Sequence, residues 1–171
     1  MKLQELFDVQ RKLDKQITEK HGLQNENLLP KKILALQVEL GELANEARFW
    51  KFWSEDQEPR TFGIKEVWHE EDHGPQQIKT NPLLEEYVDC LHFILSIGLE
   101  RGVDLEYDWH KSKRENITEH FLVLFCDVAD LRFSSNPKLA YLSLVAHFIG
   151  LGDMLGFTWD QVEKAYLAKN E

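Results

Sequence analysis

Two pairs of acidic residues stand out because each lies in a stretch that otherwise predicts a buried helix. Glu39 and Glu42 are three positions apart, and so are Glu86 and Asp89. Residues at this spacing share one face of a helix, so each pair would present both carboxylates in the same direction. Apolar residues flank both pairs, where unpaired charge is costly. Four carboxylates that meet inside a helical bundle would repel one another unless cations lay between them.

The chemistry of these ligands favours magnesium. A set of carboxylate oxygens suits a hard cation such as Mg2+, whereas a di-iron bundle would repeat Glu-x-x-His on inward-facing helices. That spacing occurs at Glu66/His69 and Glu70/His73, within a polar connection. We therefore expect a Mg2+ site that acts on a phosphate-containing substrate. The alternative is that some of the acids lie on solvated faces or pair with Lys or Arg.

Two neighbouring residues could support such a site. Glu46 follows Glu42 by about one helical turn and could join the cluster. His92 follows Asp89 by three positions and lies on the same face. We interpret His92 as a core histidine that is hydrogen-bonded to a carboxylate, rather than as a direct metal ligand.

An aromatic segment follows the first acidic pair and allows two interpretations. It contains Trp50, Lys51 and Trp53. The two tryptophans could pack the end of a helix into the core, which is the interpretation that residue types favour. They could instead form a wall on which a nucleobase stacks, with Lys51 reaching phosphate oxygens.

Helices would position these residues. Apolar residues recur every three or four positions through most of the chain, which predicts an all-α bundle of about six helices around a four-helix acidic metal site. Residues 54–81 form a long polar connection, with a short helix or strand near 64–68. No alternating pattern predicts a sheet. The predicted helices span residues 3–21, 31–51, 82–101, 116–132, 137–155 and 159–169.

Composition limits the function further. The 171 residues suffice for one domain, 1–171, with a proper core. A net charge of −10 argues against binding to nucleic acid, although Lys and Mg2+ could still hold a nucleotide. Cys90 and Cys126 lie in apolar runs and predict core residues of a reducing compartment. With no apolar run of about 18 residues and no leader pattern, we expect a cytoplasmic protein that binds no membrane.

At these motifs the chain resembles the dimeric all-α dUTPases, which belong to the helical, MazG-like NTP pyrophosphohydrolase superfamily. The matching segments are Val38–Glu46, Phe49–Ser54, Glu85–Phe93 and Glu163–Asn170. The resemblance implies that a homodimer hydrolyses dUTP to dUMP and pyrophosphate with Mg2+. We expect two or more ions.

The resemblance also implies roles for individual residues. Glu39 or Glu42 would orient or deprotonate the attacking water. The metal ligands would be Glu39, Glu42, Glu86 and Asp89; the nucleoside pocket would include Gln10, Asp14, Trp50 and Trp53; the phosphates would meet Lys51, Lys164 and Lys169. In the family a further segment follows the last helix and closes on the nucleotide, whereas this sequence stops at Glu171. Two alternatives stay open: a sister enzyme for dCTP or modified nucleotides, and a non-catalytic helical dimer, which this ending would support.

Overall fold

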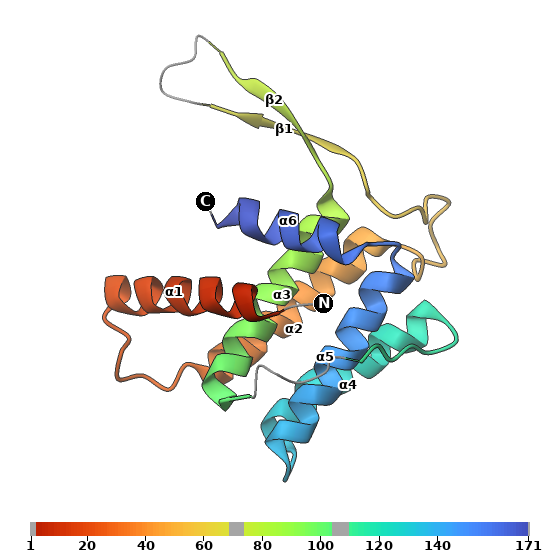
Figure 1. Ribbon diagram of the computed structural model, residues 1–171. Helices are drawn as coiled ribbons and strands as arrows, with labels where there is room; N and C mark the ends of the chain where they lie inside the picture. Colours follow the sequence, from red (N-terminus) through yellow and green to blue (C-terminus); the bar gives the residue numbers. More distant parts are fainter. Residues whose placement is uncertain (1–2, 69–73, 104–109, 171) are drawn as a thin grey trace.

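A computed structural model describes residues 3–68, 74–103 and 110–170, and these residues are mainly helical (Figure 1). The described helices are α1 (Gln4–His21), α2 (Leu29–Ala47), α3 (Pro82–Arg101), α4 (Ile117–Phe133), α5 (Pro137–Met154) and α6 (Trp159–Lys169). Two short strands, β1 (Gly63–Val67) and β2 (Gln76–Thr80), lie between α2 and α3. The prediction of an all-α fold with about six helices is confirmed.

Local signals set several of the helix boundaries. The side chain of Asn81 caps α3 by accepting a hydrogen bond from the backbone N–H of Leu84 at 3.1 Å. The same helix ends before Gly102, whose φ of 59° is left-handed and therefore favours glycine. A capping box formed by Thr158 and Gln161 starts α6. These ends agree with the predicted ranges.

The predicted end of the second helix at residue 51 is wrong, because α2 stops at Ala47. Arg48 adopts a left-handed conformation with φ of 62°. Its guanidinium group donates to the backbone oxygen of Asp56 at 2.7 Å and pairs with the Asp56 carboxylate at 3.1 Å. These contacts cross a loop, so they can hold Arg48 in a conformation that local helical periodicity does not reveal. The aromatic segment consequently leaves the helix. It packs towards α4, where the ring centroids of Phe49 and Phe121 lie 5.6 Å apart.

The long polar connection contains an antiparallel hairpin that projects from the helices (Figure 1). Gly63 pairs with Thr80, and Val67 pairs with Gln76. The strand option near 64–68 is thus confirmed, but the second strand was not predicted. Its residues are largely exposed and polar, so they lack the alternation of a half-buried strand.

The central helix of the bundle is α3, which contacts α1, α2, α5 and α6. Reciprocal hydrogen bonds join α3 to α5: the hydroxyl of Tyr87 donates to the backbone oxygen of Phe148, and that of Tyr141 donates to Ile94, both at 2.9 Å. The helices approach closely because Gly98 has no side chain; a Cβ there would lie 2.2 Å from the Tyr141 hydroxyl oxygen. This packing fixes the direction in which α3 presents its acidic face.

Among the described residues, no single helix has the length and apolar character needed to cross a membrane. By these criteria α5 and α6 pass as a pair, although a bend of 106° separates them. Much of α5 is buried in the core of the bundle.

Candidate active site

Packing of α2 against α3 brings three of the four predicted metal ligands together. Glu39, Glu42 and Glu86 each place a carboxylate oxygen within 4.8 Å of the other two. Asp89, one turn after Glu86, interacts electrostatically with this group but is not part of it. Its carboxylate instead forms an ion pair with Lys169 at the end of α6. Glu39, Glu42 and Glu86 thus form a close group from two helices, and Asp89 lies near it; we refer to the four acids together as the carboxylate cluster.

The cluster is electrostatically strained. Burial, followed by the charges of Asp89 and Glu42, raises the pKa of Glu39 above its ordinary value. Burial and the surrounding carboxylates raise the pKa of Glu86 to about 7. Neighbouring carboxylates repel one another when they are ionised, and a cation bound between them offsets this repulsion. The oxygen-only donor set therefore fits Mg2+.

A cavity of about 640 Å3 adjoins the cluster and is bordered by Glu39 and Asp89. Residues of α1, α2 and α3 line it, together with the end of α6. Gln10 and Asp14, which were predicted for the nucleoside pocket, both lie in its wall. Its apolar wall includes Leu13, Ile17, Leu28 and Phe93. Four helices therefore surround one space that has a carboxylate edge and a mixed polar and apolar lining.

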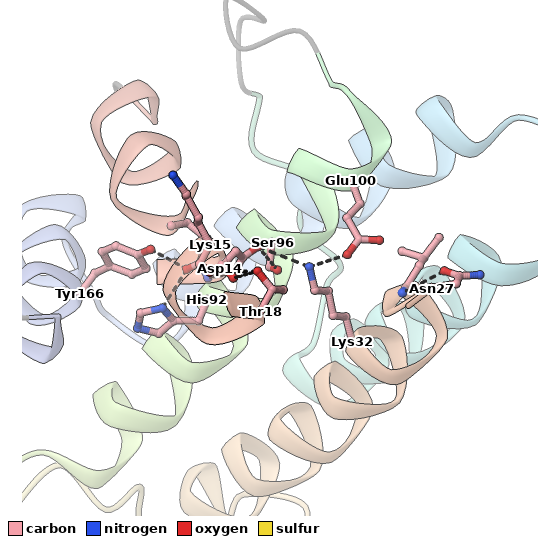
Figure 2. Close-up of polar contacts among 11 residues, drawn as sticks. Asp14, Lys15, Thr18, Asn27, Lys32, His92, Ser96, Glu100 and Tyr166 are labelled. Carbon is pink, nitrogen blue, oxygen red and sulfur yellow. Dashed lines mark hydrogen bonds and ion pairs between the residues drawn. The ribbon is translucent and has the colours of Figure 1, made fainter. Parts of the chain in front are cut away.

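Asp14 is the centre of a polar network in this cavity (Figure 2). Its carboxylate accepts hydrogen bonds from the Gln10 amide at 2.7 Å and from the Ser96 hydroxyl at 2.5 Å. The ammonium group of Lys32 lies 3.4 Å from Asp14 and 2.5 Å from Glu100, bridging the two carboxylates. The network joins α1, α2 and α3, so it can hold the cavity wall in one arrangement.

A second set of contacts fixes the orientation of Gln10. A carboxylate only accepts hydrogen bonds, so Gln10 must turn its NH2 group towards Asp14. Its oxygen Oε1 then accepts from the Tyr166 hydroxyl at 2.7 Å and from Nδ1 of His92 at 3.0 Å (Figure 2). Burial lowers the pKa of His92 to about 4, which keeps the ring neutral. The prediction that His92 is hydrogen-bonded to a carboxylate is wrong, because Nδ1 of His92 bonds to the side-chain amide of Gln10 instead.

Other predicted residues lie away from this cavity. Trp50 donates from Nε1 to the backbone oxygen of Ala44 at 2.8 Å and lines a separate cavity between α2 and α4. Lys51 lies over the Trp50 ring, with its ammonium group 5.5 Å from the ring centroid. The side chain of Trp53 is 64% exposed, so it neither packs in the core nor borders the site cavity.

Two further predicted residues face other surroundings. Glu46 pairs with Arg60 at 3.2 Å, while its other carboxylate oxygen is buried without a hydrogen-bond partner among the described residues. Lys164 is exposed on α6 and does not line the cavity. Of the lysines predicted for the phosphates, Lys169 is therefore the one that the structure places beside the cluster.

Three residues of the site were missed by the sequence reasoning. Lys32, Ser96 and Tyr166 all contact the polar network, yet none belongs to an acidic or aromatic motif. Spacing could have found two of them: Lys32 precedes Glu39 by two helical turns, and Ser96 follows Asp89 by the same interval. Such spacing places residues on one helix face.

Comparison with known protein families identifies the family of this chain. A family model described as dUTPase matches residues 2–70 and 67–171, which together span nearly the whole chain. The chain therefore belongs to the all-α dUTPase family, whose members are hydrolases that act on nucleotides. No match was found among curated proteins.

Proposed function

We propose that this protein hydrolyses dUTP to dUMP and pyrophosphate in a Mg2+-dependent reaction. The observation that carries the proposal is the cavity of about 640 Å3, which Glu39 and Asp89 border where it adjoins the carboxylate cluster. This volume is in the usual range for small-molecule sites. Membership of the dUTPase family supports a nucleotide as the ligand. Such an activity would keep uracil out of DNA and supply dUMP.

The four carboxylates would hold two or more Mg2+ ions. When bound, the ions would neutralise triphosphate charge and acidify the attacking water. The ligands would be Glu39, Glu42, Glu86 and Asp89. Burial, followed by the charges of Glu42, Asp89 and Glu39, raises the pKa of Glu86, and a cation bound by these carboxylates would relieve both effects.

Glu39 is the best-placed group to receive a proton. It belongs to the cluster and also lines the cavity, whereas Glu42 is exposed and does not line it. A carboxylate beside the attacking water can accept its proton, and Glu39 is the member of the close group that both is partly buried and borders the cavity. Glu39 would therefore orient the water for in-line attack and take its proton, while Glu42 serves as a ligand.

The cavity lining suggests how the nucleotide lies. The triphosphate would occupy the part bordered by Glu39, Asp89 and Lys169, near the cations. The nucleoside would lie along α1, where Gln10 and Asp14 provide polar contacts beside apolar side chains. The fixed orientation of Gln10 supports this assignment, because a pre-oriented polar group loses little entropy when it binds a ligand.

We also propose that the protein forms a homodimer through one face of α2 and α4. These helices pack against each other and expose large apolar side chains. Leu34 and Val38 of α2 are 62% and 52% exposed, and Leu122 and Phe133 of α4 are 54% and 82% exposed. Apolar surface of this kind is typical of an interface with another protein chain. Because the chain resembles dimeric dUTPases, we propose that the partner is a second copy of this chain.

A substrate panel tests the proposed function. Each deoxynucleoside triphosphate is incubated with the protein and Mg2+, and released pyrophosphate is converted to phosphate for colorimetric detection. We expect dUTP to be the preferred substrate. Preference for dCTP or for a modified nucleotide would indicate the sister activity, and no turnover of any nucleotide would indicate a non-catalytic dimer.

A further inference from the structure

A lysine occupies the position of a cation at the carboxylate cluster. Lys169, the last residue of α6, donates hydrogen bonds to both carboxylate oxygens of Asp89 on α3. Asp89 is also the acid that lies outside the close group of three carboxylates. The charge of Lys169 also acts weakly on Glu39 and Glu86, against the larger effects of burial and of the neighbouring carboxylates.

The backbone that carries Lys169 is held in place independently of this ion pair. Tyr166, one turn earlier on α6, is fully buried and donates to Gln10 at 2.7 Å. Its ring stacks on His92, with a centroid separation of 4.3 Å. The side chain of Asn170 donates to the backbone oxygen of Tyr166 at 2.6 Å. Release of the ammonium group would therefore move a flexible lysine side chain and leave α6 where it is.

We propose that Lys169 is a resident counter-ion, which a divalent cation displaces from Asp89 and which then pairs with the triphosphate of the bound nucleotide. The ammonium group and a divalent cation compete for Asp89, because both are attracted to the same carboxylate and their positive charges repel each other. Lys169 and Asp89 border the same cavity, so a triphosphate there lies within reach of the released side chain. The second half of the proposal rests on the proposed function; the displacement from Asp89 does not.

Lys169 should couple the binding of the metal ion to the binding of the nucleotide. Before nucleotide binds, the ammonium group competes with the metal ion, so Lys169 weakens metal binding. Once a triphosphate is present, the released ammonium group gains a new partner, so Lys169 strengthens nucleotide binding. Metal and nucleotide therefore bind with positive coupling, and by linkage each raises the affinity of the other. A lysine that merely ends a helix would produce neither effect.

Calorimetry of the full chain tests the displacement. Mn2+ or Mg2+ is titrated into the nucleotide-free protein and into Lys169→Met, whose side chain is similar in length but uncharged. Because the ion pair is partly exposed, we expect the variant to bind the metal about two- to fivefold more tightly. Lys164→Met, an exposed lysine of the same helix, is the matched control and should bind as the unsubstituted protein does. Lys169→Arg keeps the charge and should restore the weaker affinity.

The second titration uses a non-hydrolysable dUTP analogue in the presence of Mg2+. Here Lys169→Met should bind more weakly than the unsubstituted protein, so the two titrations change in opposite directions. Unchanged or weaker metal affinity in Lys169→Met would overturn the proposal, as would an equal effect of Lys164→Met. If the unsubstituted protein binds no analogue, the proposed function fails, and the metal titration alone still decides the displacement. Circular dichroism confirms folding of each variant, and the 45% exposure of the Lys169 side chain makes its loss tolerable.

Discussion

Replacing Glu86 with Gln should stabilise the metal-free protein at neutral pH. Burial and the charges of Glu42, Asp89 and Glu39 raise the pKa of Glu86 from 4.5 to about 7 in the folded protein. The folded protein therefore binds this proton more tightly than the unfolded chain does. Below both pKa values Glu86 is neutral in the folded and the unfolded protein, so it does not change the free energy of unfolding. Above both, it is a partly buried charge among like charges and destabilises the folded protein. The free energy of unfolding should thus fall as the pH rises from 4.5 to about 7.

The size of the effect follows from the position of the side chain. The full pKa difference would correspond to about 3 kcal/mol, at about 1.4 kcal/mol per unit. Glu86 is only partly buried, so solvent screening should reduce the effect to about 1 kcal/mol. In a domain of this size, that change moves the melting temperature by about 2–4 °C. Glu86→Gln cannot ionise, so near neutral pH and in EDTA it should melt that much higher than the unsubstituted protein.

Thermal unfolding followed by circular dichroism, in EDTA and across this pH range, measures the difference. Glu85→Gln is the matched control, because Glu85 is the neighbour of Glu86 on α3 and lies outside the close carboxylate group. Added Mg2+ should raise the melting temperature of the unsubstituted protein by mass action, and less so that of Glu86→Gln, which lacks one anionic ligand. The reasoning is refuted if Glu86→Gln shows the same pH dependence as the unsubstituted protein, or if Glu85→Gln shows the same gain.

Three further substitutions test other parts of the molecule. Tyr166→Phe removes one donor to the buried Gln10 amide and should lower the free energy of unfolding in urea by about 1 kcal/mol; an unchanged value would contradict the assigned hydrogen bond. Lys51→Ala should leave the KM for dUTP unchanged, because Lys51 lies on Trp50 outside the cavity; a large increase would instead place it at the phosphates. Leu122→Asp should convert dimers to monomers in light scattering, whereas Leu139→Asp, another exposed leucine on a different helix, should not; a dimer that survives Leu122→Asp excludes the proposed face.

Much of the fold could be predicted because local signals and tertiary structure agree. Pro82 and Gly102 bound α3 in the sequence as they do in the structure, and Thr158 begins α6 through its own side chain. The end of α2 could not be predicted, because the left-handed Arg48 is held by contacts with Asp56 across a loop. The strand β2 was missed because exposed polar residues carry no periodic burial pattern.

In the site, too, features within one helix could be predicted, whereas contacts between helices could not. The i, i+3 spacing predicts that each acidic pair shares one helix face, and three of these four carboxylates form the close group in the structure. The partners of the cluster are tertiary: Lys169 is 80 positions from Asp89 in the sequence, and no periodicity within one helix relates them. The aromatic segment was assigned to the nucleoside pocket by family position, yet Trp50 turns back onto α2 once the helix ends early. The faces of the helices were therefore predicted more accurately than the point at which α2 ends.

The central claim is that the carboxylate cluster hydrolyses dUTP with Mg2+. The most direct measurement compares the rate of dUMP formation by the unsubstituted protein, Glu39→Gln and Asp130→Asn, with circular dichroism to verify folding. Glu39→Gln keeps the shape of the side chain and removes both its charge and its basicity, whereas Asp130 is an exposed acid of α4. We expect the rate to fall at least about 100-fold in Glu39→Gln and to be unchanged in Asp130→Asn. An undiminished rate in Glu39→Gln, or no dUTP hydrolysis by the unsubstituted protein with Mg2+, would contradict this claim.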